Sequence, residues 1–118
     1  MDDVLDQAVL DELREAVGDP ALLERLVLNA ATNGSRLVET IVASCRDGDS
    51  DGLRRAAHAL RGTSGQYGAL GVSRRAAAVE HAVISGLTVP VGDVDALAAE
   101  WSAAAAALRA YVGPDTPA

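Results

Sequence analysis

The sequence lacks phenylalanine and lysine altogether and contains a single cysteine, Cys45. Aromatic residues make up only 3% of its 118 residues, although 49% are hydrophobic. The core must therefore be built from alanine, leucine and valine, which pack well between closely spaced helices. One cysteine excludes an intrachain disulfide. The length fits one domain, which at this size buries about two-thirds of its unfolded surface on folding.

Long apolar runs and an excess of basic residues are also absent. No run approaches the roughly 18 apolar residues of a membrane-spanning helix, and the start of the chain lacks the basic-then-apolar layout of a signal peptide. The net charge of −7 disfavours general nucleic-acid binding. The one cysteine and two histidines lack the spacing of metal ligands. We therefore expect a cytoplasmic protein without metal, membrane or nucleic-acid partners.

Glycine and proline divide the remaining sequence into helical segments. Apolar residues recur with helical spacing over residues 4–17, which predicts a short first helix. The pair Asp19-Pro20 is typical of the cap and first residue of a second helix. We expect that helix to run from residue 21 to 45. Its apolar stripe keeps its phase across the pair Asn33-Gly34, which is a possible break.

Three more helices are expected after a turn at residues 47–52. They are predicted at about 53–67, from about 72 with Ser73 as a possible cap, and from about 93 to 113. No stretch alternates in the manner of a strand. The predicted fold is all-α, an antiparallel four-helix bundle with a short extra N-terminal helix, over residues 1–112. Residues 113–118 are expected to form a disordered tail.

The predicted helix at 53–67 carries an unusual histidine. At 100° per residue, one helix face collects the residues expected in the core: Leu53, Ala56, Ala57, Leu60, Thr63, Ser64 and Tyr67. His58 points about 160° away from Leu60 and therefore faces solvent. A lone exposed histidine is usually only solvated, so a function for His58 needs further support.

Two features beside His58 supply that support. Gly62 and Gly65 follow on nearly the same side, although a glycine inside a helix costs about 1 kcal/mol relative to alanine. Space for an approaching partner would explain both. No acid lies between Asp51 and Glu80, but five of the ten arginines do: Arg54, Arg55, Arg61, Arg74 and Arg75. This arrangement predicts a basic patch that suits a phosphoryl group and an acidic partner.

Residues 57–69 read Ala-His-Ala-Leu-Arg-Gly-Thr-Ser-Gly-Gln-Tyr-Gly-Ala. This segment resembles the signature of histidine-containing phosphotransfer (HPt) domains. In that family a histidine is followed by an apolar residue, a basic residue and a glycine at two, three and four positions later, and by Gly-Ala at ten and eleven. Residues 13–20, 47–51 and 78–80 also fit, so the resemblance covers about residues 8–110. The departures are Arg61 where lysine is commoner, and Leu28 or a neighbour where an aromatic is often found.

The resemblance implies that His58 accepts a phosphoryl group from the aspartate of one receiver domain and passes it to another in a two-component phosphorelay. Arg61 then contacts the phosphoryl group, and Arg54, Arg55, Gly62 and Gly65 form the partner-binding surface. The partners are receiver domains of response regulators or hybrid histidine kinases. The receiver supplies Mg²⁺, so this chain needs no cofactor. Such a chain is a phosphohistidine carrier, not a turnover enzyme, and we expect a monomer.

Several alternatives remain at this point. An HPt-like bundle could bind a receiver or kinase without carrying phosphate, although the intact motif argues against this. The histidine-bearing domain of a chemotaxis-type kinase shares the motif. A hydrolase is disfavoured because His58, Ser64 and the acids show no triad-like arrangement. A purely structural bundle leaves the two glycines and the arginines unexplained.

Overall fold

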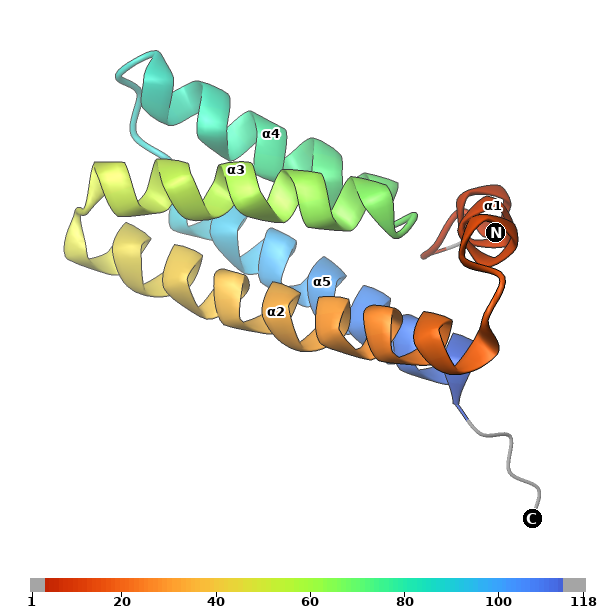
Figure 1. Cartoon of the computed structure of the whole chain (residues 1–118). Helices are drawn as coiled ribbons and strands as arrows, with labels where there is room; N and C mark the ends of the chain where they lie inside the picture. Colours follow the sequence, from red (N-terminus) through yellow and green to blue (C-terminus); the bar gives the residue numbers. More distant parts are fainter. Residues whose placement is uncertain (1–3, 114–118) are drawn as a thin grey trace.

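The computed structural model describes residues 4–113. Over these residues it contains helices and no strand: α1 (Gln7–Val17), α2 (Pro20–Asp47), α3 (Ser50–Gln66), α4 (Leu70–Ile84) and α5 (Val91–Val112). Helices α2 to α5 form an antiparallel bundle, and α1 lies across one end of it (Figure 1). The prediction of an all-α bundle with a short extra N-terminal helix is confirmed. Apart from Gly113, the predicted disordered tail lies outside the described residues.

Side-chain caps and left-handed glycines fix the ends of the helices. The Asp19 carboxylate accepts a hydrogen bond from the backbone N–H of Ala21 at 3.0 Å, and Pro20 occupies the first turn, which starts α2. Gly48 ends α2 with a φ of 72°, and Asp49 then caps α3. Only two residues, Gly48 and Asp49, therefore separate α2 from α3, which holds the two helices antiparallel and adjacent.

The prediction that Ser73 caps the fourth helix is wrong. α4 begins at Leu70, because Gly68 takes a φ of 85° and the N–H of Ala69 donates to Ser64 O at 2.8 Å. This tight reversal leaves no room for a longer connection. Ser73 therefore lies inside α4, where its hydroxyl donates to the carbonyl of Arg61 at 3.0 Å. The residue links α4 to α3 instead of starting a helix.

The long second helix continues without a break through Gly34, as its apolar stripe predicts. Gly34 is buried, and a Cβ added there would overlap the indole ring of Trp101 on α5. The indole N–H of Trp101 donates to Ser35 Oγ at 3.1 Å. The glycine therefore marks a site of close approach between α2 and α5 and not a weak point of the helix.

The core contains the residue types that the composition requires. Its largest fully buried side chains are aliphatic and come from all five helices: Leu10, Val27, Ile41, Leu60, Val72, Val94, Leu97 and Leu108. Tyr67 and Trp101 are also buried. α3 packs against α2 on one flank and α4 on the other, so its outward face is the part available for chemistry. No helix within residues 4–113 is both long and apolar enough to span a bilayer.

Candidate functional site

His58 lies in the middle of α3 and points outward, as its helical position predicts. The residues on the opposite face are buried, among them Ala57, Leu60 and Ser64. The His58 side chain is 66% exposed. A histidine used only to fill the core would not be placed in this way, so the orientation leaves the ring open to a partner.

A buried carboxylate from the neighbouring helix contacts this histidine. Glu80 on α4 brings its Oε2 to within 2.7 Å of Nδ1 of His58, and its Oε1 accepts a hydrogen bond from Arg61 at 3.0 Å. Only 10% of the Glu80 side chain is exposed. One carboxylate therefore joins the two side chains that the sequence motif places one turn apart on α3.

The protonation state of Glu80 determines which ring nitrogen is free. Burial raises the pKa of the Glu80 carboxyl, but the hydrogen bonds from His58 and Arg61, with the electrostatic attraction of both groups, hold it below its ordinary value. Glu80 is therefore ionised at neutral pH. An ionised carboxylate only accepts hydrogen bonds, so Nδ1 of His58 is the donor. The neutral imidazole then carries its lone pair on Nε2, the other ring nitrogen.

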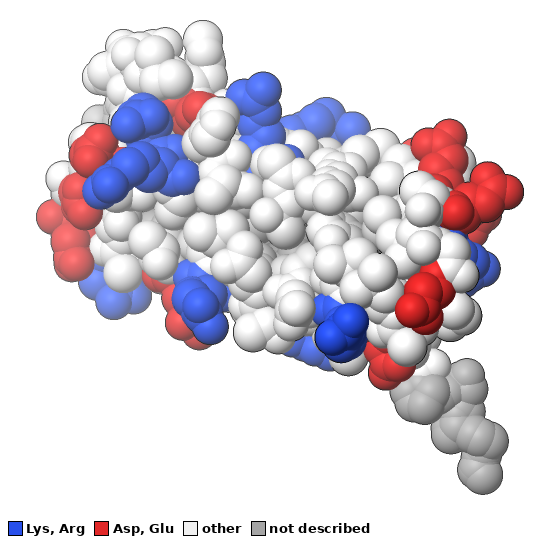
Figure 2. All heavy atoms as spheres, viewed as in Figure 1, with Lys and Arg blue, Asp and Glu red and all other residues white. Residues whose placement is uncertain are grey.

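Most arginines of the predicted basic patch are paired with acids. Arg54 and Arg55 pair with Asp51 at 3.2 and 3.1 Å, one turn earlier on the same helix. Arg61 pairs with Glu80, and Arg75 pairs with Glu100. Four of its five arginines share three acids, so the patch keeps a net positive charge. Helical spacing brings Asp51 to it, and the packing of α4 on α3 brings Glu80. Figure 2 shows acidic and basic side chains side by side at the end of the molecule where α3 begins.

The two glycines after His58 have different surroundings. A Cβ added at Gly62 would meet nothing within 4 Å, so the surface beside His58 is open at this point. A Cβ added at Gly65 would lie 3.3 Å from the hydroxyl of Ser73. Gly65 therefore also allows the close approach of α4 within the molecule, a role that the sequence analysis did not assign.

Two hydroxyl groups support the backbone of α3 at these glycines. The carbonyl of Arg61 accepts a hydrogen bond from Ser73 at 3.0 Å and lies 3.3 Å from the hydroxyl of Ser64. Ser64 also donates to the carbonyl of Leu60, four residues earlier. These bonds hold the turn that follows His58, although glycine favours helix poorly. The position of Arg61 is thereby fixed at its backbone.

Glu80 is the site residue that the sequence analysis did not identify as functional. It is 22 residues from His58, and only the packing of α4 on α3 brings the two together. The available signal was its place in the segment 78–80, which fits the family resemblance, directly after the buried Val79. The second histidine, His81, is exposed on α4.

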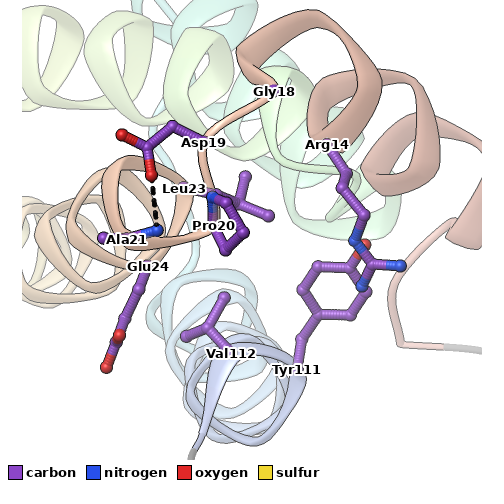
Figure 3. A pocket seen from close by; sticks show the side chains of 9 residues that line it. All are labelled: Arg14, Gly18, Asp19, Pro20, Ala21, Leu23, Glu24, Tyr111 and Val112. Atoms are coloured by element: carbon purple, nitrogen blue, oxygen red, sulfur yellow. Dashed lines mark hydrogen bonds between the residues drawn. The ribbon is translucent and has the colours of Figure 1, made fainter.

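A hollow of about 450 Å³ lies away from His58, where α1, the start of α2 and the end of α5 meet (Figure 3). The Arg14 guanidinium stacks 4.7 Å from the centroid of the Tyr111 ring, and the Asp19 carboxylate is used to cap α2. The polar groups of this hollow thus stabilise the junction of three helices. Within residues 4–113, no three histidine, cysteine or acidic side chains come together as a metal site.

Comparisons with known proteins agree with this geometry. The sequence model of the family described as "Hpt domain" matches residues 7–111. Among solved structures, the fold is similar to that of histidine-containing phosphotransfer protein B (HptB) from Pseudomonas aeruginosa PAO1. The TM-score is 0.86 with 19% sequence identity, and the match covers 95% of this chain and 96% of that one. No curated protein sequence matches.

Proposed function

Because the Hpt domain family model covers nearly the whole chain, the chain belongs to this family, and we propose from this premise that His58 is its phosphoacceptor. The histidine takes a phosphoryl group from the aspartate of one receiver domain and passes it to another. The observation that supports this most directly is the hydrogen bond of 2.7 Å between His58 Nδ1 and the ionised Glu80. It leaves Nε2 with a lone pair on a side chain that faces solvent.

In the forward step, Nε2 of His58 attacks the phosphorus of the receiver's aspartyl phosphate. A bond from Nε2 to phosphorus forms, the bond from the aspartate oxygen to phosphorus breaks, and the aspartate leaves as a carboxylate. The proton on Nδ1 stays in place, so the ring becomes positively charged as the new bond forms. Glu80 is already oriented toward that charge and stabilises it. In the onward step the same bonds form and break in reverse, with a second receiver.

Arg61 is proposed to contact the phosphoryl oxygens. Its guanidinium bonds Glu80 through one nitrogen, and a guanidinium has five N–H donors, so others remain for an incoming anion. Gly62, with open space around it, lets the receiver come close to the ring. Phosphoryl transfer depends chiefly on positioning and on charge stabilisation, so two side chains and an open surface are sufficient. The Mg²⁺ of the reaction belongs to the receiver in this proposal.

Arg54, Arg55 and Gly65 are proposed as further parts of the receiver-binding surface. The two arginines lie one turn before His58, and their pairing with exposed Asp51 leaves them free to exchange partners on binding. A module that binds receivers without carrying phosphate is the alternative function, but it would have no use for a carboxylate that orients the histidine ring. The cytoplasmic location and the monomeric state stay predictions.

The experiment that tests the proposed function is phosphoryl transfer from a panel of isolated receiver domains. Each receiver is charged with radiolabelled acetyl phosphate, freed of donor and mixed with the chain. We expect label on the chain that is labile in acid and stable in base, and that moves to a second, unlabelled receiver. No label from any receiver, although binding is detected, would support the non-catalytic module instead.

Replacing Glu80 with glutamine should slow phosphoryl acceptance by about tenfold to a hundredfold, by analogy with the loss of a carboxylate that orients a metal-binding histidine. The amide can donate to Nδ1 as well as accept from it, so the ring loses its fixed tautomer and the charge that stabilises it. Single-turnover transfer from a saturating charged receiver measures the rate, and the ¹⁵N shifts of the imidazole report the tautomer.

The matched control for Glu80→Gln is Glu100→Gln, the same change in the ion pair with Arg75, away from His58. The control should keep both the rate and the imidazole tautomer. An unaltered rate in Glu80→Gln, or an equal loss in both variants, would remove the proposed role of the carboxylate.

A further inference from the structure

The most exposed large apolar side chains in the described part of the chain gather at one end of the bundle. Ile84 is 64% exposed, Leu87 is 63% exposed and Val91 is 63% exposed, all within eight residues of sequence. Figure 2 shows an uncharged protrusion where α4 ends, with basic side chains next to it over the start of α3. We refer to Ile84 and Leu87 together as the end patch.

Leu87 is exposed where a leucine ordinarily packs. Gly86 takes a φ of 75° after α4, and the N–H of Leu87 donates to the carbonyl of Ala82 at 2.8 Å. In this type of helix ending, the apolar residue after the glycine frequently packs back on the helix. Here Leu87 instead borders a hollow of about 310 Å³, together with Leu53, Val83 and Val89. The side chain is therefore available to a partner.

The antiparallel packing of α3 and α4 places Ile84, the first residue of the end patch, near His58. Glu80 on α4 faces His58 on α3, and the two helices are antiparallel. Arg54, four residues before His58, therefore lies opposite Ile84, four residues after Glu80. Ile84 also lies on the same side of α4 as Glu80, one turn on. Four residues of helix span about 6 Å, so Ile84 lies roughly one turn from the reactive ring.

We propose that the end patch is an apolar docking contact for the receiver domain, a proposal that rests on the function assigned to His58. A standard interface covers about 800 Å² on each partner, equivalent to a circle with a radius of roughly 16 Å. An interface of this size centred on Nε2 therefore reaches Ile84, and Leu87 follows three residues later in the chain. The matching receiver surface is an apolar group with acidic neighbours, because Arg54 lies opposite Ile84 in this register and basic side chains adjoin the uncharged protrusion in Figure 2.

A second copy of the chain fits this surface less well. A symmetric dimer about the end patch would bring Arg54 and Arg55 of each copy toward those of the other, and each chain carries a net charge of −7. It would also cover the flank of His58 from which the aspartate approaches. The receiver is therefore the occupant that the surroundings of the patch favour.

The test is the double variant Ile84→Ser with Leu87→Ser, assayed with the receiver that binds the wild-type chain most tightly. Binding of the uncharged receiver is measured by calorimetry, and single-turnover transfer is measured over a range of charged receiver. We expect the dissociation constant and the half-saturating concentration to rise by about tenfold, as for the loss of buried apolar contacts. The transfer rate at saturation should stay unchanged, because neither side chain contacts the ring.

The control is Val91→Ser, which removes an equally exposed side chain at the start of α5, a helix that packs on α2 and α4. It should bind the receiver as the wild type does. Unchanged binding by the double variant, or an equal loss in the control, would overturn the proposal. The proposal would also be overturned if sedimentation showed that the wild type is a dimer and that the double variant is a monomer with unchanged receiver binding. Because calorimetry needs no phosphate, loss of transfer alone counts against the function of His58 and not against the docking contact.

Discussion

Replacing His58 with glutamine is expected to abolish labelling of the chain by charged receivers, leaving less than about 1% of the wild-type level. Glutamine keeps a polar side chain of similar length, but an amide nitrogen has no lone pair available for attack on phosphorus. His58 projects into solvent from α3, so the fold should be unaffected. Circular dichroism and thermal unfolding verify that the variant is folded.

The chain contains its own control for this prediction. His81→Gln makes the same change at the only other histidine, which is also exposed but has no carboxylate against its ring among the described residues. It should accept label at the wild-type rate. If His58→Gln is labelled as strongly as the wild type, or if His81→Gln is the variant that loses label, the phosphoacceptor has been assigned to the wrong residue.

Replacing Gly34 with alanine should lower the free energy of unfolding by about 1–3 kcal/mol, the range found when an extra carbon is forced into a packed core. The added Cβ would overlap the indole of Trp101, and the ring cannot swing away, because it is buried and bonded to Ser35. Denaturant titration measures the loss. Trp101 is the only tryptophan, so its fluorescence reports on the same contact.

Gly62→Ala is the matched control for this substitution. It makes the same change inside a helix, but the new Cβ meets open space. Alanine is favoured over glycine in an exposed helix by about 1 kcal/mol, so this variant should gain stability by up to that amount. Equal behaviour of the two variants would show that helix propensity, and not the contact between Gly34 and Trp101, decides the stability of α2.

The fold was accessible from the sequence because it depends on local signals. Asp19-Pro20, the helical stripes and the outward position of His58 all follow from spacing along single helices. The partner of His58 was not accessible in this way, since Glu80 reaches the ring only through the register of two helices. The same limit explains why the pairing of Arg61 with Glu80 was not foreseen. Acids outside the arginine-rich stretch were taken as distant, although helical packing brings Glu80 and Asp51 back to it.

The carboxylate of Glu80 also affects the stability of the phosphorylated state. Under the proposed function, the phosphorylated ring is a cation facing a fixed anion, so the pairing lowers the free energy of the loaded state and not only of the transition state. Arg61 also pairs with this carboxylate. It weakens the pairing of Glu80 with the ring while it stays on Glu80, and strengthens it when it turns to a phosphoryl oxygen. Under the proposed function, the balance between these two partners shifts the equilibrium ratio of phosphorylated to unphosphorylated chain, which is one contribution to the direction of a reversible relay.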